Sequence, residues 1–321
     1  MAMKAAATSS PGAVQATNDD ASASKLSCVK KGYILDDFVH FFVKRPIKRA
    51  PLINRGYYAR WAAIRKLLLQ FLDSVGPKQI LSLGAGFDTT YFQLEEEGRG
   101  EVKYVELDFL EVTSRKATII ASREQLQKKV ESLGTISPER GEIHSKHYML
   151  LPVDLRDINS LEKAFECAQL DISVPTFILS ECVLIYLDPD VSRAVVNWAA
   201  QKFNTAVFVV YEQYSPEDAF GQQMIKNLES RGCPLLGIHD TPSLEAKRER
   251  FTKNGWPRAV ALNMDEIYRS EIDPIDRRRI ERLEIFDEFE EWHMMQEHYC
   301  LAYGIKDATQ GMFDNFGFGV R

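Results

Sequence analysis

Gln79-Ile-Leu-Ser-Leu-Gly-Ala-Gly-Phe-Asp-Thr-Thr90 is the stretch of this sequence that decides the fold. It begins as an apolar run of strand length, which meets Gly84 and Gly86 and continues into a helix-like segment. The two glycines allow a sharp turn and a close approach of the backbone to a ligand, because neither carries a Cβ. A second apolar strand, 102–109, follows and carries Asp108 near its end. This spacing is typical of a Rossmann-like unit that presents an acid to a ribose diol, so we predict a nucleoside-containing cofactor.

The residue three positions after the second glycine is Thr89, where the dinucleotide-binding fingerprint requires a third glycine. That glycine serves close helix packing near a pyrophosphate, so its absence disfavours a nicotinamide- or flavin-dependent oxidoreductase. S-adenosylmethionine contains an adenosine and no phosphate, and needs the tight turn and the ribose acid alone. Asp108 is the predicted ribose ligand. Glu106 is the alternative, because side chains two apart on a strand share a face, and a helix cap is the competing role for Asp108.

Five strand candidates alternate with helical stretches, which indicates a doubly wound α/β fold with a mostly parallel sheet. They lie at 79–83, 102–109, 148–155, 175–184 and 206–212, and two more are expected at 258–262 and 298–305. Ligands of such sheets bind beyond the carboxyl ends of the strands, where this sequence places acids. Asp154 ends the third candidate and can accept an adenine amino group while Leu155 packs on the ring, or it can cap a helix. Glu181 ends the fourth candidate and Glu212 the fifth.

An amphipathic helix is predicted over 57–72, where apolar residues recur at spacings of three and four. Arg60 lies on the flank of its apolar face. A half-buried arginine needs an anion or several acceptors, unless its stem packs and its head reaches water. The basic residues around it, between 30 and 65, form either a solvated face or a surface for an acidic partner.

Composition narrows the class of protein further. The 321 residues suffice for one large α/β domain, and no stretch approaches the roughly 18 apolar residues that a membrane span needs. Five scattered cysteines without CxxC spacing indicate reduced thiols in the cytosol, and the net charge of −6 argues against nucleic acid. We predict a disordered tail at 1–20, a single domain at 21–306 with an insertion at 215–256, and a loose tail at 307–321.

Metal and nucleophilic catalysis find no support in the sequence. His144 and His147 are spaced like helix-borne metal ligands but lie in a predicted loop without a third ligand nearby, so no metal is expected. No GxSxG elbow or paired Cys and His is present.

Several blocks of the sequence closely resemble the eukaryotic leucine carboxyl methyltransferases. These blocks are Leu83-Gly-Ala-Gly-Phe-Asp-Thr-Thr90, Val153-Asp-Leu-Arg-Asp157, Ser180-Glu-Cys-Val-Leu-Ile-Tyr186, Phe220-Gly-Gln-Gln-Met-Ile-Lys-Asn-Leu228, Ile53-Asn-Arg-Gly-Tyr-Tyr-Ala-Arg60 and Asp287-Glu-Phe-Glu-Glu291. The resemblance implies a class I S-adenosylmethionine-dependent methyltransferase with an N-terminal helical extension. It also implies methyl esterification of the C-terminal leucine of the protein phosphatase 2A catalytic subunit, which regulates phosphatase assembly.

The family's cofactor contacts, transferred by resemblance, fall on Lys25, Arg60, Gly84, Asp108, Asp154, Leu155 and Glu181. Arg60 would then hold the methionine carboxylate, which supplies the anion that its position requires. A relative within the superfamily acts in wybutosine synthesis on transfer RNA and carries a repeat-built propeller after this domain. Because this sequence contains no such repeats, we expect the phosphatase-directed member; a non-catalytic phosphatase-binding protein on the same fold is a further alternative.

No catalytic acid or base is predicted. A peptide α-carboxylate has a pKa of about 3.3–3.7 and is already ionised at pH 7. We expect the substrate near the insertion, Tyr186 and 212–214, with the basic N-terminal region as a docking surface. The expected protein is a cytoplasmic monomer that contacts the C-terminal tail and active-site face of the phosphatase subunit.

Overall fold

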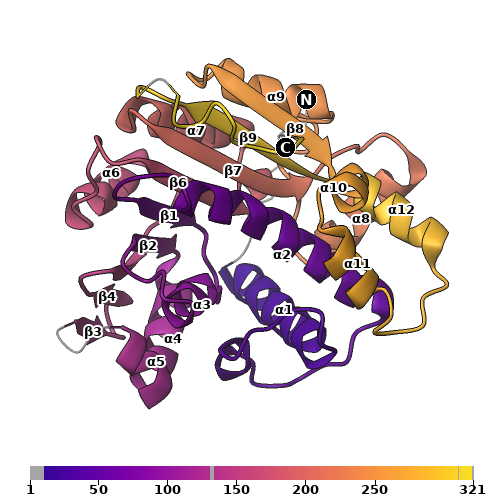
Figure 1. Ribbon diagram of the computed structural model, residues 1–321, viewed down its shortest axis with the longest axis horizontal. Coiled ribbons are helices and arrows are strands. Elements are labelled where there is room, and N and C mark those ends of the chain that lie inside the picture. Colours follow the sequence, from indigo (N-terminus) through magenta and orange to yellow (C-terminus); the bar gives the residue numbers. More distant parts are fainter. Residues whose placement is uncertain (1–10, 131–133, 310, 320–321) are drawn as a thin grey trace, which may run out of the picture.

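A central mixed sheet organises the computed structural model, which describes residues 11–130, 134–309 and 311–319. The sheet has nine strands in the order β3-β4-β5-β2-β1-β6-β7-β9-β8 (Figure 1). The strands are β1 Gln79–Leu83, β2 Lys103–Asp108, β3 Thr135–Ser137, β4 Glu142–His144, β5 Tyr148–Pro152, β6 Thr176–Glu181, β7 Ala206–Gln213, β8 Arg258–Asn263 and β9 Tyr299–Lys306. All the strands that the sequence predicts are therefore confirmed, and β3 and β4 are additional.

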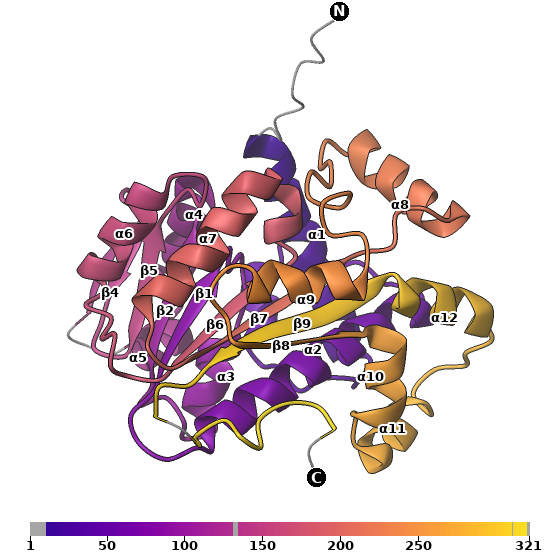
Figure 2. The same ribbon diagram turned by 90° about the horizontal axis from the view of Figure 1, so that it is seen from above.

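Helices cover both faces of this sheet (Figure 2). They are α1 Pro11–Lys30, α2 Pro51–Leu72, α3 Thr90–Glu96, α4 Leu110–Ala121, α5 Glu124–Lys129, α6 Ile158–Cys167, α7 Pro189–Lys202, α8 Ala219–Ser230, α9 Leu244–Thr252, α10 Met264–Ser270, α11 Pro274–Ile280 and α12 Phe289–Glu297, with short 3-10 helices η1 Val39–Phe42 and η2 Leu184–Tyr186. None of the helices in these described ranges combines the length and apolar character that a bilayer span needs.

The strand pairing produces the predicted doubly wound arrangement. β5, β2, β1, β6 and β7 are mutually parallel, whereas β9 and β8 add antiparallel strands at one edge and β4 and β3 at the other. The strand order reverses between β1 and β6, and ligands of doubly wound sheets bind at such a switch point. The central strands are buried throughout, which explains their continuous apolar sequences.

Two hydrophobic layers enclose the sheet. One contains side chains of α2, α3, α4 and α10, including Leu67, Phe92 and Ile120. The other contains side chains of α6, α7 and the α9 region, including Val195 and Trp256. With both faces covered, the open edge at the carboxyl ends of the strands is where a ligand can approach.

The N-terminal prediction is corrected by α1. Residues 11–20 belong to this helix, so a disordered tail over 1–20 is wrong for that part; residues 1–10 lie outside the described residues. The sequence has no apolar stripe there, but Ala23, Ser24 and Ser27 are buried. Such small side chains permit close packing against α2, and tertiary contact rather than amphipathicity stabilises the helix.

The C-terminal prediction is also corrected. Phe313 and Phe316 are buried, and the Phe313 ring stacks on Phe71 with 6.0 Å between centroids. The N–H of Gly317 donates to Gln70 at 2.9 Å. Residues 311–319 therefore pack against the domain, because their aromatic side chains have apolar surface to bury, and are not a loose tail; 310, 320 and 321 lie outside the described residues.

The segment predicted as an insertion, 215–256, divides into two parts. α8 and the turn after it form a small apolar cluster with Ile185, which includes Met224, Leu235 and Ile238. α9 instead packs on β8 and β9 as a regular layer helix. The inserted part therefore ends before α9, at about residue 242.

Candidate functional site

The glycine turn follows β1 at the switch point of the sheet. Gly84 has φ +67°, in the left-handed region, and a Cβ there would lie 2.4 Å from Val183 Cγ2. The N–H groups of Gly84 and Ala85 both donate to the carbonyl of Leu107, at 2.7 and 3.1 Å. The turn is thus held against the end of β2, and its first glycine is required by both φ and space.

Asp108 connects this turn to the end of β2. Its carboxylate accepts hydrogen bonds from the N–H of Gly86 and the N–H of Phe109, both at 2.7 Å. Burial raises the pKa of Asp108 to about 6, although these two donors act in the opposite direction. α4 begins after Phe109 without a side-chain cap, so the helix-cap alternative for Asp108 is not supported. Asp108 lies where the predicted ribose ligand is needed.

Glu106, the alternative ribose ligand, is enclosed below the turn. Its carboxylate accepts from Lys116 Nζ at 2.5 Å and Tyr148 Oη at 2.7 Å, and burial raises its pKa to about 7. Lys116 also donates to the carbonyl of Asp88 at 2.8 Å. Glu106 and Lys116 are both completely buried, so Glu106 supports the turn from below, whereas Asp108 lies at the turn itself.

Arg60 and Glu181 approach each other on the opposite side of the site. Arg60 Nε, on α2, donates to the Glu181 carboxylate at the end of β6. The guanidinium lies 4.8 Å from the ring centroid of Tyr211 and 5.6 Å from that of Tyr57. Burial alone would lower the pKa of Arg60, but Glu181 and the neighbouring Cys182, Tyr211 and Tyr57 side chains together outweigh it and raise the pKa. Two predicted site residues are thereby in contact, and Arg60 keeps its charge in a partly buried aromatic setting.

Lys25 reaches the far end of the turn from α1. Its Nζ donates to Thr89 Oγ1 at 2.7 Å and lies 3.0 Å from the Asp36 carboxylate and 3.6 Å from the Asp88 carboxylate. Burial would lower the pKa of Lys25, but Asp36 and Asp88 outweigh it and raise the pKa above its ordinary value. A second permanent cation therefore lies beside the glycine turn.

Asp154 and Leu155 lie beyond β5. Asp154 accepts from the N–H of Arg156 and from its guanidinium, with a shortest distance of 2.6 Å to Nη2. Partial burial would raise the pKa of Asp154, but these bonds hold it below its ordinary value. Asp157 caps α6, so the cap role proposed for Asp154 is wrong. The Leu155 side chain packs in the core cluster instead of standing free.

Sequence reasoning missed several side chains that complete the site. Tyr211 and Tyr57 flank Arg60, and Asp36 accepts from Lys25. Asn18 of α1 lies over the turn, with its Oδ1 2.6 Å from the position of a Cβ on Gly86. The aromatic residues carried a detectable signal, since both lie in predicted elements. Asn18 and Asp36 carried none, because their roles depend on where α1 and the following loop pack.

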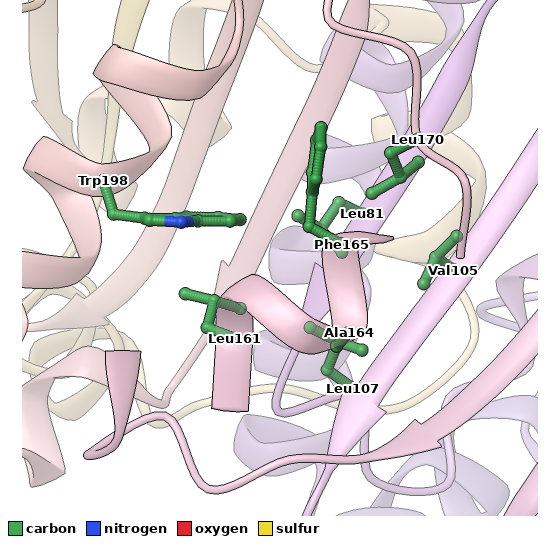
Figure 3. A pocket seen from close by; sticks show the side chains of 8 residues that line it. All are labelled: Leu81, Val105, Leu107, Leu161, Ala164, Phe165, Leu170 and Trp198. Carbon is green, nitrogen blue, oxygen red and sulfur yellow. The ribbon is translucent and has the colours of Figure 1, made fainter. Parts of the chain in front are cut away.

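Two further features of the described residues bear on alternative sites. An apolar hollow lies between α6, α7 and the sheet, and its eight lining side chains include Leu81, Phe165 and Trp198 (Figure 3). It lacks the charged groups that a nucleoside or amino acid needs. Over the described ranges, His, Cys, Asp and Glu side chains form no group that could hold a metal ion, and no cysteine forms a disulfide.

Comparison with known proteins assigns the family. The sequence profile described as leucine carboxyl methyltransferase matches residues 1–200. The chain is 63% identical over 308 residues to a leucine carboxyl methyltransferase 1 homolog of Arabidopsis thaliana, covering 95% of this chain and 92% of the relative. This chain belongs to the leucine carboxyl methyltransferase family. It is an enzyme of that family, as the sequence predicted.

Two further similarities concern a relative with a different name and a solved structure. The chain is 43% identical to the human tRNA wybutosine-synthesizing protein 4, covering 93% of this chain but 45% of that protein. A solved structure of a proposed methyltransferase from Thermobifida fusca aligns with a TM-score of 0.53 and 16% identity, covering 80% of this chain and 84% of that one. The latter shows the fold, which is that of class I S-adenosylmethionine-dependent methyltransferases.

Proposed function

We propose that this protein transfers a methyl group from S-adenosylmethionine to the C-terminal leucine α-carboxylate of the protein phosphatase 2A catalytic subunit. The observation that carries the proposal is the grouping at the switch point of one acid held by the glycine turn, Asp108, and two cations, Arg60 beside Glu181 and Lys25 beside Thr89, in a chain of this family. The 63% identity to the Arabidopsis leucine carboxyl methyltransferase 1 homolog, which extends over nearly the full length of both chains, supports a leucine carboxylate as the substrate.

The residues at the turn fit S-adenosylmethionine. Asp108 would accept the ribose hydroxyls, and the space that a Cβ at Gly84 would fill lets the cofactor approach the backbone. Arg60 and Lys25 would bind the methionine carboxylate. Ser180 Oγ and Asn18 Nδ2 are buried near this turn and have no hydrogen-bond partner within the described part of the chain, as expected of a site that is completed by a polar ligand.

The chain's own residues would bind the charged groups of the two reactants and hold them in position. S-adenosylmethionine, when bound, supplies an electrophilic methyl group that a carboxylate oxygen accepts without proton transfer. The substrate carboxylate is ionised at pH 7, so no side chain need act as a general base. The rings of Tyr57 and Tyr211 exclude water around Arg60, which strengthens its interaction with an anion. Catalysis therefore rests on alignment of the two reactants.

The substrate's leucine would approach beside the inserted part of the chain. The N–H of Gly237 donates to the carbonyl of Ile185 at 3.0 Å, which fixes the insertion against η2 next to Tyr186. The Tyr211 and Tyr299 rings stack with 5.6 Å between centroids along the same side. Glu212, expected at this opening, is instead completely buried with Lys247 and Arg250 and cannot meet a substrate.

Docking of the folded phosphatase would involve the exposed basic residues of the loop before α2, Lys44, Arg45 and Lys48. They follow η1 and precede Arg49, which pairs with Asp20 on α1. This places the basic loop close to the helix that borders the site, where it suits an acidic protein surface. We further propose that the enzyme is monomeric, acts in the cytoplasm and binds no nucleic acid.

The decisive experiment incubates the protein with methyl-labelled S-adenosylmethionine and phosphatase 2A, either intact or lacking its terminal leucine, and in parallel with transfer RNA. We expect label on the intact phosphatase alone, in a base-labile ester. Label that persists after removal of the leucine, or that appears on transfer RNA, would refute the substrate. Binding of the phosphatase without any transfer would instead establish a non-catalytic binding protein.

A further inference from the structure

Asp36, in the loop between α1 and η1, lies at the centre of a buried hydrogen-bond network. Its Oδ1 accepts the N–H groups of Phe38 and Val39, at 2.9 and 3.0 Å. Its Oδ2 accepts Thr89 Oγ1 at 2.6 Å and Gln93 Nε2 at 3.0 Å. The carboxylate is fully enclosed, and the two oxygens serve different tasks: one orders its own loop and the other faces the glycine turn.

The oxygen that faces the turn also meets Lys25, whose Nζ lies 3.0 Å away. Lys25 and Thr89 are bonded to each other as well, at 2.7 Å. Thr89 occupies the position where a dinucleotide-binding turn has glycine. Its hydroxyl accepts a hydrogen bond from the Lys25 ammonium and donates one to the Asp36 carboxylate. Three segments, α1, the loop after it and the start of α3, therefore converge on one carboxylate.

Loss of the negative charge would leave the Lys25 ammonium with a more distant anion. The other carboxylate near it, on Asp88, is at 3.6 Å and already accepts the N–H of Thr90 at 3.1 Å. A lysine has several rotatable bonds and is held at one point by the anions around it. The direction in which Lys25 projects is thus set chiefly by Asp36.

We propose that Asp36 is a positioning residue, which holds Lys25 and Thr89 at the edge of the glycine turn so that the Lys25 ammonium can bind the carboxylate of the methyl donor. The inference rests on the proposed function, because it assigns the ligand of Lys25. Asp36 itself does not touch the cofactor; it acts through Lys25. Its role adds a residue to the site that neither spacing nor a motif in the sequence identifies.

The substitution Asp36→Asn separates charge from loop structure. The remaining amide oxygen can still accept from Phe38 and Val39, whereas the NH₂ group faces the donors of Thr89, Gln93 and Lys25. We expect the KM and Kd for S-adenosylmethionine to rise by about tenfold or more, with kcat changed by less than about threefold, because a charged hydrogen-bond partner is lost from binding. The exposed neighbour offers a matched control, Asp37→Asn, which should leave both constants unchanged.

A double-mutant cycle tests whether the effect passes through Lys25. In a Lys25→Met background, the further change Asp36→Asn should alter the cofactor Kd by less than about twofold, since the group to be positioned is gone. Thr89→Val, which removes the shared hydroxyl at nearly constant volume, provides a second route should Asp36→Asn unfold, and should also raise KM rather than lower kcat. Circular dichroism melting of each variant reports folding.

Each outcome decides the inference. Non-additive Kd changes for Asp36→Asn and Lys25→Met, or a KM-selective effect of Thr89→Val, support it. Native cofactor affinity in a folded Asp36→Asn variant overturns it while leaving the proposed function intact, and so do fully additive effects. Failure of the native protein to bind S-adenosylmethionine overturns both together.

Discussion

Replacement of Asp108 by asparagine should weaken cofactor binding and, in the unliganded protein near neutral pH, make the fold more stable. Asp108 is 7% exposed and its carboxylate accepts two backbone N–H groups at 2.7 Å, yet burial raises its pKa to about 6. The folded protein therefore binds this proton more tightly than the unfolded chain, whose carboxyl has the ordinary pKa of 3.8. Stability from this group is fully present below pH 3.8 and is lost as the pH rises through about 6.

The magnitude follows from the two pKa values. A separation of about two pH units corresponds to about 3 kcal/mol of stability lost by the native protein at pH 7 and above. Of this, about 1 kcal/mol is lost between pH 5 and pH 7. Asparagine has one acceptor oxygen, so one backbone N–H loses its partner at a cost of about 2 kcal/mol. The variant should thus be more stable than the native protein by about 1 kcal/mol at pH 7.5, and this advantage should shrink as the pH falls.

Urea unfolding of both proteins at pH 5, 6, 7 and 8 without cofactor measures this difference, and titration calorimetry measures S-adenosylmethionine binding. We expect the Kd of Asp108→Asn to rise by about 10- to 100-fold. The exposed carboxylate of Glu101 supplies the control, Glu101→Gln, whose stability difference from the native protein should not vary over this range. A stability difference for Asp108→Asn that is constant from pH 5 to 8 would refute the reasoning.

Three further substitutions probe other parts of the structure. Gly84→Ala should reduce the free energy of unfolding by about 2–4 kcal/mol, from the left-handed φ and the 2.4 Å approach to Val183, and urea titration should show partial recovery in the double variant with Val183→Ala; full native stability of the single variant would contradict the close approach. Arg60→Ala should weaken S-adenosylmethionine binding by about 10- to 100-fold in calorimetry, whereas the exposed Arg278→Ala should not, and equal affinities would exclude Arg60 from the site. Phe316→Ala should destabilise the fold by about 3 kcal/mol in thermal unfolding, and an unchanged melting temperature would restore a loose C-terminal tail.

The parallel strands were predictable from the sequence because each is a continuous apolar segment that is separated from the next by a helical stretch. β1 has the predicted bounds, since a continuous apolar segment ends at Gly84. β3 and β4 were not predicted: each has three residues, too few to show a period. The N-terminal helical extension that the resemblance implies is present as α1, but the local sequence did not reveal it, because small and polar side chains such as Ala23, Ser24 and Ser27 are buried there against α2.

The site was predictable where one residue at a strand end suffices. Asp108 and Glu181 lie where the order of strands places them. The sequence could not distinguish Asp108 from Glu106 as the acid at the turn, because the distinction depends on where α4 packs. Lys116 on that helix forms a buried ion pair with Glu106. The position of Lys25 depended likewise on Asp36, which follows it in a loop without periodicity. Pairings across packed elements are set by tertiary geometry, which a single sequence does not encode in its local patterns.

The place of β9 in the sheet has a consequence for synthesis of the chain. β9 lies between β7 and β8 and pairs with both, and among the strands of the described residues β8 pairs with β9 alone (Figure 1). While the ribosome is still adding the residues after β8, that strand has no partner and the β7 edge is open. The sheet closes only when Tyr299–Lys306 has emerged, so the nascent enzyme exposes two unpaired strand edges until β9 is made. Chaperones that shield such edges would act on this protein in the interval between synthesis of β8 and synthesis of β9.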